Sequence, residues 1–486
     1  MMKMPETAWS DERIQSALMA RRENDIRWRE GKAFGFVYDV GRDVEKVARD
    51  AYGIFMSDNA LDPTSFPSLL GLENDVVAMA AGLLESPSGV AGSVTSGGTE
   101  SIMLAVKSAR EHARRHRADV DAPELVLPET AHAAFHKAAD YLGISVVIVP
   151  VDPETFTAVP DAMEAAITPN TIMLVGSTPS YAHGVFDPIE ALAEVATRHD
   201  LLFHVDACVG GFILPFLRKL GRPIPCFDFR IPGVTSISMD LHKFAYVPKG
   251  ASVVLYRDAE LRKHQFFACS DWSGYSVINP TVQSSRSGGP LAMAWAVLHY
   301  LGEEGYLRLA GELDQASRAF FEGVESIPGL RILGTPCMSL VAITSDDFDI
   351  LKVVDAMTSR GWYVQAQVAH RNSPANMHLT IAPSNIPLMG ALLEDLRVAV
   401  ESVREEGKVE LPVWAASLNG DLFKDGVPPA MLSQIMAAAG LTGGGGLPDE
   451  MAEIHAMMGA IPTELSDVLL CEFVNQLFQV TGADAA

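Results

Sequence analysis

The chain has 486 residues, of which 48% are hydrophobic and 20% are charged, and its formal net charge is −24 at pH 7. This composition is typical of a large globular enzyme with one major domain and one or two smaller ones. A surface of this sign repels nucleic acid and anionic membranes, so neither is expected as a partner, and any anion site must be built locally.

The N-terminal segment and the cysteines indicate the compartment. Residues 1–32 are rich in charge and lack the apolar core of a signal peptide, and no apolar run in the sequence approaches the ~20 residues of a membrane span. The five cysteines form no Cys-x-x-Cys pair. We therefore predict a soluble, cytoplasmic protein with reduced thiols and no integral membrane segment.

Short apolar strands alternate with helical patterns between residues 90 and 260. The expected strands cover 91–95, 124–127, 145–150, 171–176, 201–206, 234–239 and 251–256. The helical patterns between them cover 99–116, 131–142, 160–168 and 187–199. This alternation predicts an α/β protein with a mainly parallel seven-stranded sheet and helices on both faces. Ligands bind such sheets beyond the carboxyl ends of the strands.

The pattern changes near residue 330. Strands at 338–344 and 376–382 around a helix at 348–360, followed by a helix at 387–405, predict a smaller α+β C-terminal domain. A stretch with prolines (411–429) and the run Gly443–Gly446, which indicates a flexible connector, precede a final helix at about 463–479. The expected divisions are an N-terminal segment (1–57), a large domain (58–325), a small domain (326–410) and a C-terminal extension (411–486).

A glycine turn follows the first expected strand, in Thr95-Ser-Gly-Gly-Thr-Glu-Ser101. Glycines let the backbone approach an anion closely, and the first-turn amides of the helix that follows have no acceptor within the helix. We expect Gly97 and Gly98, with the hydroxyl of Thr99, to bind a phosphate. Taken alone, an ordinary strand-to-helix turn would look the same.

Asp206 and Lys243 each come at or just after the end of a later strand. A buried carboxylate needs a positive partner, and a protonated ring nitrogen would be one for Asp206. Lys243 could form an imine with a cofactor aldehyde if its amine is neutral. We expect burial and the positive field of His242 and Lys249 to lower the pKa of Lys243. In isolation, Asp206 could instead cap a helix, and Lys243 could be a solvated loop lysine.

His132 and His136 are four residues apart, a spacing that also occurs in helical metal sites. Because no acidic third ligand lies nearby in the sequence, we expect no metal and favour a single imidazole, His132, stacked on an aromatic cofactor. An anion cradle, a buried acid and a lysine in this order are together what pyridoxal 5'-phosphate (PLP) needs. We predict PLP as the cofactor.

The same segments resemble PLP-dependent enzymes of fold type I in the group II decarboxylase family, most closely the sphingosine-1-phosphate lyase branch. The matching stretches reach over nearly the whole chain and are Thr95–Ile102, Ala131–Phe135 with Lys137–Ala139, His204–Phe212, Asp240–Phe244 with Pro248–Gly250, Ser285–Gly288 and the final helix, Met451–Phe478.

The resemblance implies a PLP-dependent transferase-like fold and a role for each matched residue. Lys243 would bind the cofactor covalently, Asp206 would pair with the ring nitrogen, and His132 would stack on the ring. The residues around the cofactor phosphate would be Gly97, Gly98, Thr99 and His242, joined by Ser287 and Gly288 from a second subunit. The resemblance also implies an obligate homodimer with shared active sites, to which the N-terminal segment contributes.

Three further positions bear on the substrate. Tyr38 matches a tyrosine that reaches the active site of the lyases and, with Lys243, is a candidate for proton transfer. Lys249 matches a lysine that binds the substrate phosphate. Asp62-Pro63 departs from the lyases, which carry His-Pro there, and their histidine helps to hold that phosphate. An acid would repel it, and Asp-Pro at this place is similar to the archaeal tyrosine/aspartate decarboxylases.

These observations predict a PLP-dependent carbon–carbon lyase, similar to the sphingosine-1-phosphate lyases, that cleaves a phosphorylated amino alcohol to an aldehyde and an amine. The main alternative is an amino-acid α-decarboxylase acting on tyrosine, aspartate or glutamate. An aminotransferase and a PLP-binding protein without turnover are further alternatives on this fold. In each case the expected partner is a small amine or amino acid.

Overall fold

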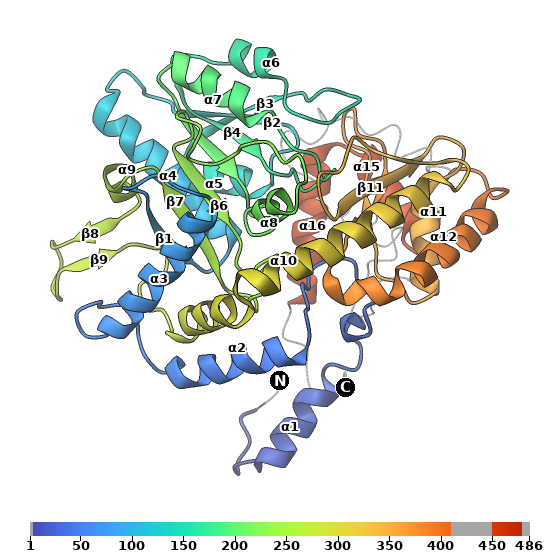
Figure 1. Cartoon of the computed structure of the whole chain (residues 1–486), viewed down its shortest axis with the longest axis horizontal. Coiled ribbons are helices and arrows are strands. Elements are labelled where there is room, and N and C mark those ends of the chain that lie inside the picture. The colour runs from blue at the N-terminus through green and yellow to red at the C-terminus, as the bar shows by residue number, and fades with distance from the viewer. Residues whose placement is uncertain (1–2, 410–449, 479–486) are drawn as a thin grey trace.

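The computed structural model describes residues 3–409 and 450–478 (Figure 1). Its main element is a seven-stranded sheet in the order β1-β7-β6-β5-β4-β2-β3. The strands are β1 (Ala91–Thr95), β2 (Glu124–Pro128), β3 (Ser145–Val149), β4 (Thr171–Ser177), β5 (Leu202–Asp206), β6 (Ser236–Met239) and β7 (Ser252–Tyr256). Neighbours from β3 to β6 pair in parallel, and β7 pairs antiparallel with both β6 and β1. The predicted mainly parallel α/β sheet is confirmed.

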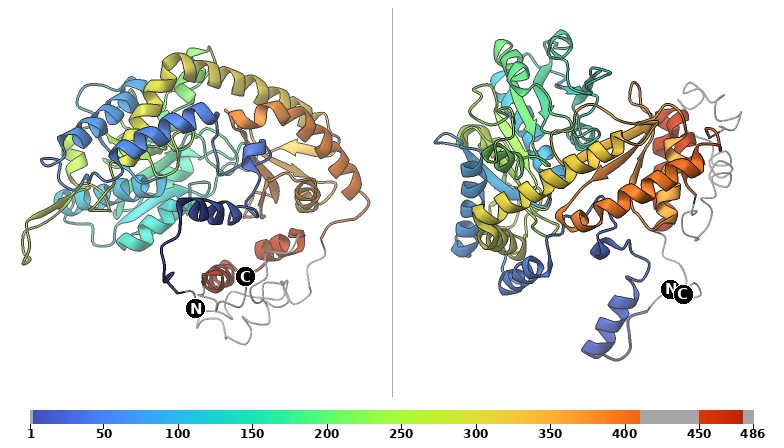
Figure 2. Two further views of the ribbon diagram at one scale, coloured as in Figure 1. Left: turned by 90° about the horizontal axis from the view of Figure 1, so that it is seen from below. Right: turned by 45° about the vertical axis from the view of Figure 1, so that its right-hand side comes forward.

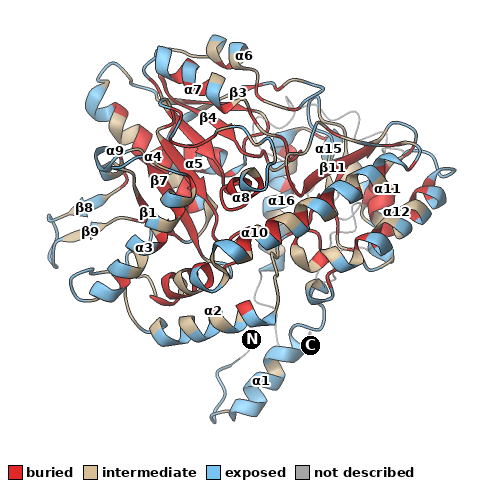
Figure 3. Cartoon of the chain, viewed as in Figure 1, coloured by how far each residue is buried: buried red, intermediate tan, exposed pale blue. Residues whose placement is uncertain are grey.

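Helices cover this sheet on both faces, as the near-continuous apolar strands require. On β2, Leu125 and Leu127 join the apolar cluster of Phe135, whereas Val126 joins the cluster of Leu192 on the other face. The central strands are accordingly buried along most of their length, whereas the edge strand β3 is largely not (Figure 3). The covering helices are α4 (Gly98–His116), α5 (Ala134–Leu142), α6 (Pro160–Ala165), α7 (Ile189–Arg198), α8 (Leu214–Lys219) and α9 (Ala259–Lys263).

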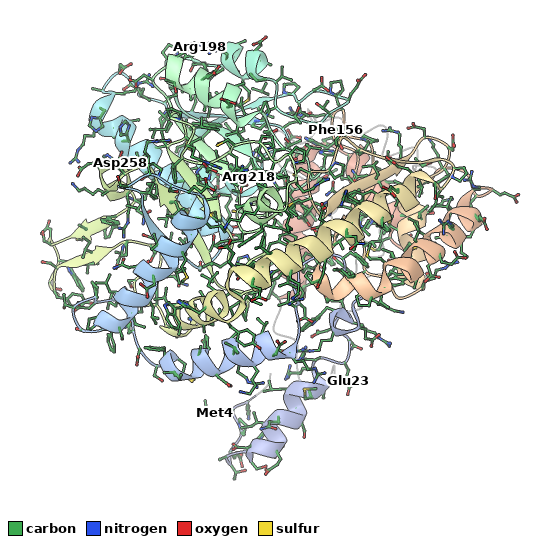
Figure 4. The ribbon with its side chains drawn as sticks, viewed as in Figure 1. Met4, Glu23, Phe156, Arg198, Arg218 and Asp258 are labelled. Carbon is green, nitrogen blue, oxygen red and sulfur yellow. The ribbon has the colours of Figure 1, made fainter. Side chains whose placement is uncertain are left out.

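A second, antiparallel sheet forms the smaller α+β part, in the order β10-β11-β13-β12. Its strands are β10 (Leu330–Ile332), β11 (Leu340–Ser345), β12 (Gln365–Gln367) and β13 (Asn376–Thr380), accompanied by α11 (Ile350–Ser359), the 3₁₀ helix η2 (Pro383–Leu388) and α12 (Met389–Val403). The long helix α10 (Gly289–Glu325), interrupted at Gly302, runs from the large sheet to the small one (Figure 2). Phe156, labelled in Figure 4, stacks on His183 between the two sheets, with ring centroids 4.2 Å apart.

The N-terminal segment contains α1 (Asp11–Ala20), η1 (Trp28–Glu30) and α2 (Arg42–Phe55), and α3 (Pro67–Leu83) follows it. A hairpin of β8 (Phe267–Cys269) and β9 (Val277–Asn279) projects from the large sheet's side (Figure 1). The final helices are α15 (Ala452–Ala460) and α16 (Thr463–Leu477). The predicted connector at Gly443–Gly446 and the stretch 411–429 lie outside the described residues. In the part of the chain described, no helix is long and apolar enough to cross a membrane.

One predicted helix begins later than expected. The sequence pattern places it at 131–142, but α5 begins at Ala134. The reason is local, because the backbone N–H of Ala134 donates to Nδ1 of His132 at 3.1 Å. The imidazole thus accepts a hydrogen bond at the start of the helix, as a capping side chain does. This places His132 in the loop after β2 and at the rim of the cavity described next.

Candidate active site

A cavity of about 350 Å³ opens at the carboxyl ends of β4, β5 and β6, beside the first turn of α4. This is where ligands bind in parallel α/β sheets. Seven residues that the sequence analysis selected line it: Gly97, Gly98, Thr99, His132, Asp206, His242 and Lys243. Segments that are far apart in the sequence therefore meet at one site.

The glycine turn presents free backbone donors to the cavity. Among the described residues no side chain caps α4, which begins at Gly98, so its first amides are available to an anion. Buried Glu100 holds the turn, since its carboxylate accepts from the backbone N–H of Ser96 at 2.6 Å and from that of Val282 at 2.8 Å. A Cβ on Gly98 would lie 2.8 Å from both carboxylate oxygens of Asp240, so this position requires glycine.

Asp206 ends β5 and is buried, at 7% exposure. Its Oδ1 accepts from the backbone N–H of Cys208 at 3.0 Å and from the hydroxyl of Ser238 at 3.4 Å. Within the described residues, Oδ2 has no hydrogen-bond partner. An unpartnered carboxylate oxygen on a buried residue that lines a cavity suits a positively charged ligand atom, and a protonated pyridine nitrogen would fit.

The expectation that the pKa of Lys243 is lowered is wrong. The Lys243 ammonium nitrogen lies 2.8 Å from Oδ2 of Asp240, which is only 2% exposed. Burial alone would lower the pKa of Lys243, but the negative charge of Asp240, the hydrogen bond to its carboxylate and the contributions of Cys208 and Tyr38 together raise the pKa by more than burial lowers it. His242 supplies no positive field at neutral pH, because burial lowers its pKa to about 4.

Tyr38 and Lys249 lie together beside this lysine. The ring of Tyr38 packs edge-on against Phe244, with centroids 4.9 Å apart. Nζ of Lys249 lies 4.8 Å from the Tyr38 ring centroid and donates to the backbone carbonyl of His242 at 3.1 Å. Although Lys249 as a residue is exposed, the protein around its amine and then the charge of Lys243 lower its pKa to about 8. Burial raises the pKa of Tyr38 well above its usual range.

Five of the predicted site residues do not line this cavity. Two of them, Tyr38 and Lys249, line a neighbouring cavity together with His242. The other three are Asp62, Ser287 and Gly288. They belong to two segments that pair with each other. Asn59 forms an antiparallel bridge with Ser287, and the backbone N–H of Gly288 donates to the carbonyl of Asp58 at 2.9 Å. Asp62 itself organises the turn before α3, since its carboxylate accepts from the backbone and the hydroxyl of Thr64 at 2.8 and 2.6 Å.

The cavity residues that the sequence analysis did not select include Tyr181, Cys208 and Asp240. Tyr181 comes four residues after the end of β4, and its hydroxyl donates to Oε1 of Gln365 from the small sheet. Burial raises its pKa. Their position in the sequence could have identified these residues, because all three follow the end of a parallel strand, as Lys243 does.

The fold and the cavity together define the class of protein, a PLP-dependent enzyme of fold type I. The uncapped start of α4 suits the cofactor phosphate, and the unpartnered Oδ2 of Asp206 suits the ring nitrogen. Lys243 lines the same cavity as the start of α4 and Asp206, so its amine can meet the aldehyde.

Comparison with known proteins specifies the family. Residues 25–344 match the pyridoxal-dependent decarboxylase conserved domain, and residues 412–476 match a model described as a C-terminal HTH domain of pyridoxal-dependent enzymes. The chain therefore belongs to the pyridoxal-dependent decarboxylase family, and it is a PLP-dependent lyase.

Three relatives bear most on the substrate. The sphingosine-1-phosphate lyase of Oryza sativa is 43% identical over 449 residues, which cover 90% of this chain and 81% of that protein. The solved structure of a sphingosine-1-phosphate lyase from Burkholderia pseudomallei is 39% identical, with a TM-score of 0.79, and the match covers 84% of this chain and 94% of that one. A Pyrococcus furiosus protein named probable L-aspartate decarboxylase is 32% identical over 75% of this chain and 95% of its own length.

Proposed function

We propose that the protein is a carbon–carbon lyase that cleaves a phosphorylated long-chain amino alcohol, of the sphingosine-1-phosphate type, into an aldehyde and an amine. The observation that carries the proposal is the 37–44% identity to several sphingosine-1-phosphate lyases. The pair of Tyr38 and Lys249 beside Lys243 supports it, because it offers a cation for a substrate phosphate next to the reacting amine.

In this proposal Lys243 binds the cofactor covalently, Asp206 holds the ring nitrogen, and His132 stacks on the ring. The cofactor phosphate is held by Gly97, Gly98, Thr99 and His242, and by Ser287 and Gly288 of a second subunit. When bound, PLP accepts the electron pair of the bond that breaks at the substrate α-carbon. Asp206 stabilises the charge that this places on the ring nitrogen.

The remaining residues act on the substrate. Lys249, which is protonated below a pKa of about 8, attracts the substrate phosphate. Tyr38 keeps its proton at neutral pH, since burial raises its pKa, so it is suited to donate a hydrogen bond or a proton rather than to act as a base. Tyr181, at the cavity wall, contributes a second hydroxyl whose pKa is raised by burial.

Amino-acid α-decarboxylation is the second candidate. Two observations favour it, namely the acid at Asp62, where a substrate phosphate would be repelled, and the similarity to the Pyrococcus furiosus protein. In this reading carbon dioxide leaves the α-carbon and a proton takes its place.

A substrate panel separates the two candidates. Purified protein with PLP is incubated with sphingoid-base phosphates and, separately, with tyrosine, aspartate and glutamate, while aldehyde and carbon dioxide are measured. We expect aldehyde from the phosphorylated amino alcohols and no carbon dioxide from the amino acids. Release of carbon dioxide without aldehyde would overturn the lyase proposal in favour of the decarboxylase.

We further propose a homodimer in the cytoplasm as the working form. Residues 58–60 pair with residues 286–288, and neither segment lines the cavity of its own chain. Both segments are therefore available to the active site of a second subunit, which supports a shared site. The net charge of −24 and the absence of a cysteine pair motif support the compartment.

A further inference from the structure

Asp240 is a buried acid in the candidate active site, and none of the roles proposed above involves it. It lies at the end of β6, is 2% exposed, and lines the same cavity as Lys243. Its Oδ2 contacts the Lys243 ammonium at 2.8 Å and lies 3.6 Å from Nε2 of His242. In the described structure its Oδ1 is buried and has no hydrogen-bond partner. A carboxylate buried this deeply stays charged only if a positively charged partner compensates for its lost hydration.

The contact between Asp240 and Lys243 is preorganised by the backbone. The two residues are three apart in one turn, which the backbone N–H of Lys243 closes by donating to the carbonyl of Asp240 at 3.3 Å. On the opposite side Gly98 fits against the carboxylate so closely that a Cβ there would lie 2.8 Å from either oxygen. The carboxylate therefore has little room to move away from the amine.

Lys243 must change partners during each turnover of a PLP enzyme. With PLP bound, the substrate amine would arrive as an ammonium ion and form a carbon–nitrogen bond to the cofactor aldehyde carbon, while the bond from that carbon to Nζ of Lys243 would break. If both linkages are protonated imines, two protons would pass from the substrate nitrogen to Nζ, so that Lys243 would leave as an ammonium ion and nothing would be oxidised. The Lys243 side chain is only 18% exposed, so releasing this cation would be costly unless an anion receives it.

We propose that Asp240 is a positioning residue that receives Lys243 as an ammonium ion whenever a substrate amine takes its place on the cofactor. The carboxylate holds the released amine in its charged form, so the amine does not attack the cofactor again until a departing product accepts its proton. The same ion pair keeps the lysine within reach for that return. The inference rests on the proposed role of Lys243, but not on the proposed substrate.

Amine exchange on the holoenzyme tests the inference without measuring turnover. The full-length protein loaded with PLP is equilibrated with increasing methylamine and then reduced with borohydride. Mass spectrometry gives the fraction of cofactor fixed on Lys243 and the fraction released on methylamine. The ratio of these two fractions at each methylamine concentration gives the exchange constant, which is the equilibrium constant for displacement of Lys243 from the cofactor by methylamine. For Asp240→Asn we expect this exchange constant to fall by at least about fivefold, because the released ammonium loses its anion. A smaller change, or a rise, would overturn the proposal.

The controls separate this role from a structural one. Asp228 is also fully buried and paired with a cation, Arg230, at 2.6 Å, but it does not line the cavity. Asp228→Asn should leave the exchange constant unchanged, and an equal fall there would contradict a specific role for Asp240. Asp240→Ser, which is smaller and neutral, carries the same expectation if the asparagine variant does not fold. If the wild-type label is found on a lysine other than Lys243, the proposed role of Lys243 fails instead.

Discussion

At the scale of single residues, two lysines six positions apart show how the surroundings of an amine determine its pKa. Lys243 and Lys249 both lie next to the candidate site, but their pKa values shift in opposite directions. Lys243 touches the carboxylate of Asp240, whereas the amine of Lys249 is surrounded by protein and lies near the positive charge of Lys243. At neutral pH both carry a proton, but only Lys249 loses it within a range that an enzyme assay can reach.

The lowered pKa of Lys249 makes phosphate binding depend on pH. Below about pH 8 its ammonium is charged and attracts a phosphorylated substrate, and above that pH the charge is lost. We expect KM for a phosphorylated substrate to rise on the alkaline side of pH 8, by up to about tenfold per pH unit, while kcat changes less. Steady-state kinetics across this range measure the effect.

Lys249→Arg is the matched variant, because guanidinium stays charged throughout the range. It should flatten the alkaline rise in KM. A rise of the same size in Lys249→Arg would show that another group is responsible, and an amino-acid substrate without a phosphate should show no such rise in the wild type.

At the scale of elements, the start of α4 is the most constrained piece of the site. An added Cβ at Gly98 would meet Asp240 and, at 2.9 Å, the sulfur of Cys208. At Gly97 its nearest contact would be a His242 carbon at 3.3 Å. We expect Gly98→Ala to weaken PLP binding by roughly tenfold or more, since the first-turn amides would shift from the phosphate, and Gly97→Ala to weaken it less. Titration of each apoprotein with PLP by fluorescence compares them, and an equal loss in both would contradict the close approach at Gly98.

Different substitutions of Asp62 separate its structural role in the turn before α3 from its proposed effect on a substrate phosphate. Asp62 accepts hydrogen bonds from Thr64 and Ser65, and these lower its pKa, so it is charged at neutral pH. Asp62→Asn keeps an acceptor for the turn and removes the charge, and Asp62→His also restores the lyase pattern. We expect both to improve affinity for phosphorylated substrates, the histidine variant by about fivefold or more, with a lower thermal midpoint for the histidine. Reduced affinity in the asparagine variant would show that Asp62 is not near the phosphate.

A feature of the fold could be predicted from the sequence where it depends on a local pattern, and not where it depends on pairing between distant segments. The strands of the large sheet are predictable because burial on both faces makes them continuously apolar, and their observed limits lie within two residues of those expected. The three-residue strands β10 and β12 were not predicted, since pairing with β11 and β13 rather than their own pattern defines them. The expected division into domains remains a prediction.

The site shows the same limit. Gly97, Asp206 and Lys243 were found because strand ends and glycine turns are visible in a sequence. Asp240 was visible too, three residues before Lys243, but only the closed turn brings its carboxylate onto the amine and reverses the expected pKa shift. Tyr181 was missed because its partner, Gln365, lies in the other sheet.

At the scale of the whole molecule, the proposed dimer can be tested through its shared sites. Sedimentation should give about twice the chain mass of 52.3 kDa. Ser287→Asp should repel a phosphate in the partner's site, and Lys243→Ala should inactivate its own. Co-expressed as a mixed dimer, the two variants leave one site with a wild-type Lys243 and a wild-type Ser287. We expect the mixture to recover activity that neither variant has alone. No recovery in an isolated mixed dimer would place Ser287 in its own chain's site.

The bridge between Asn59 and Ser287 has a consequence for engineering. Because residues 58–60 and 286–288 are hydrogen-bonded to each other, they form a single structural insert built from two distant stretches of sequence. A chimera that borrows the Asp62 turn from a relative must borrow the other stretch with it, and an insertion in either would displace both. Lys243 and Asp206 are on other segments, so the two paired stretches can be exchanged together while both of these residues stay in place.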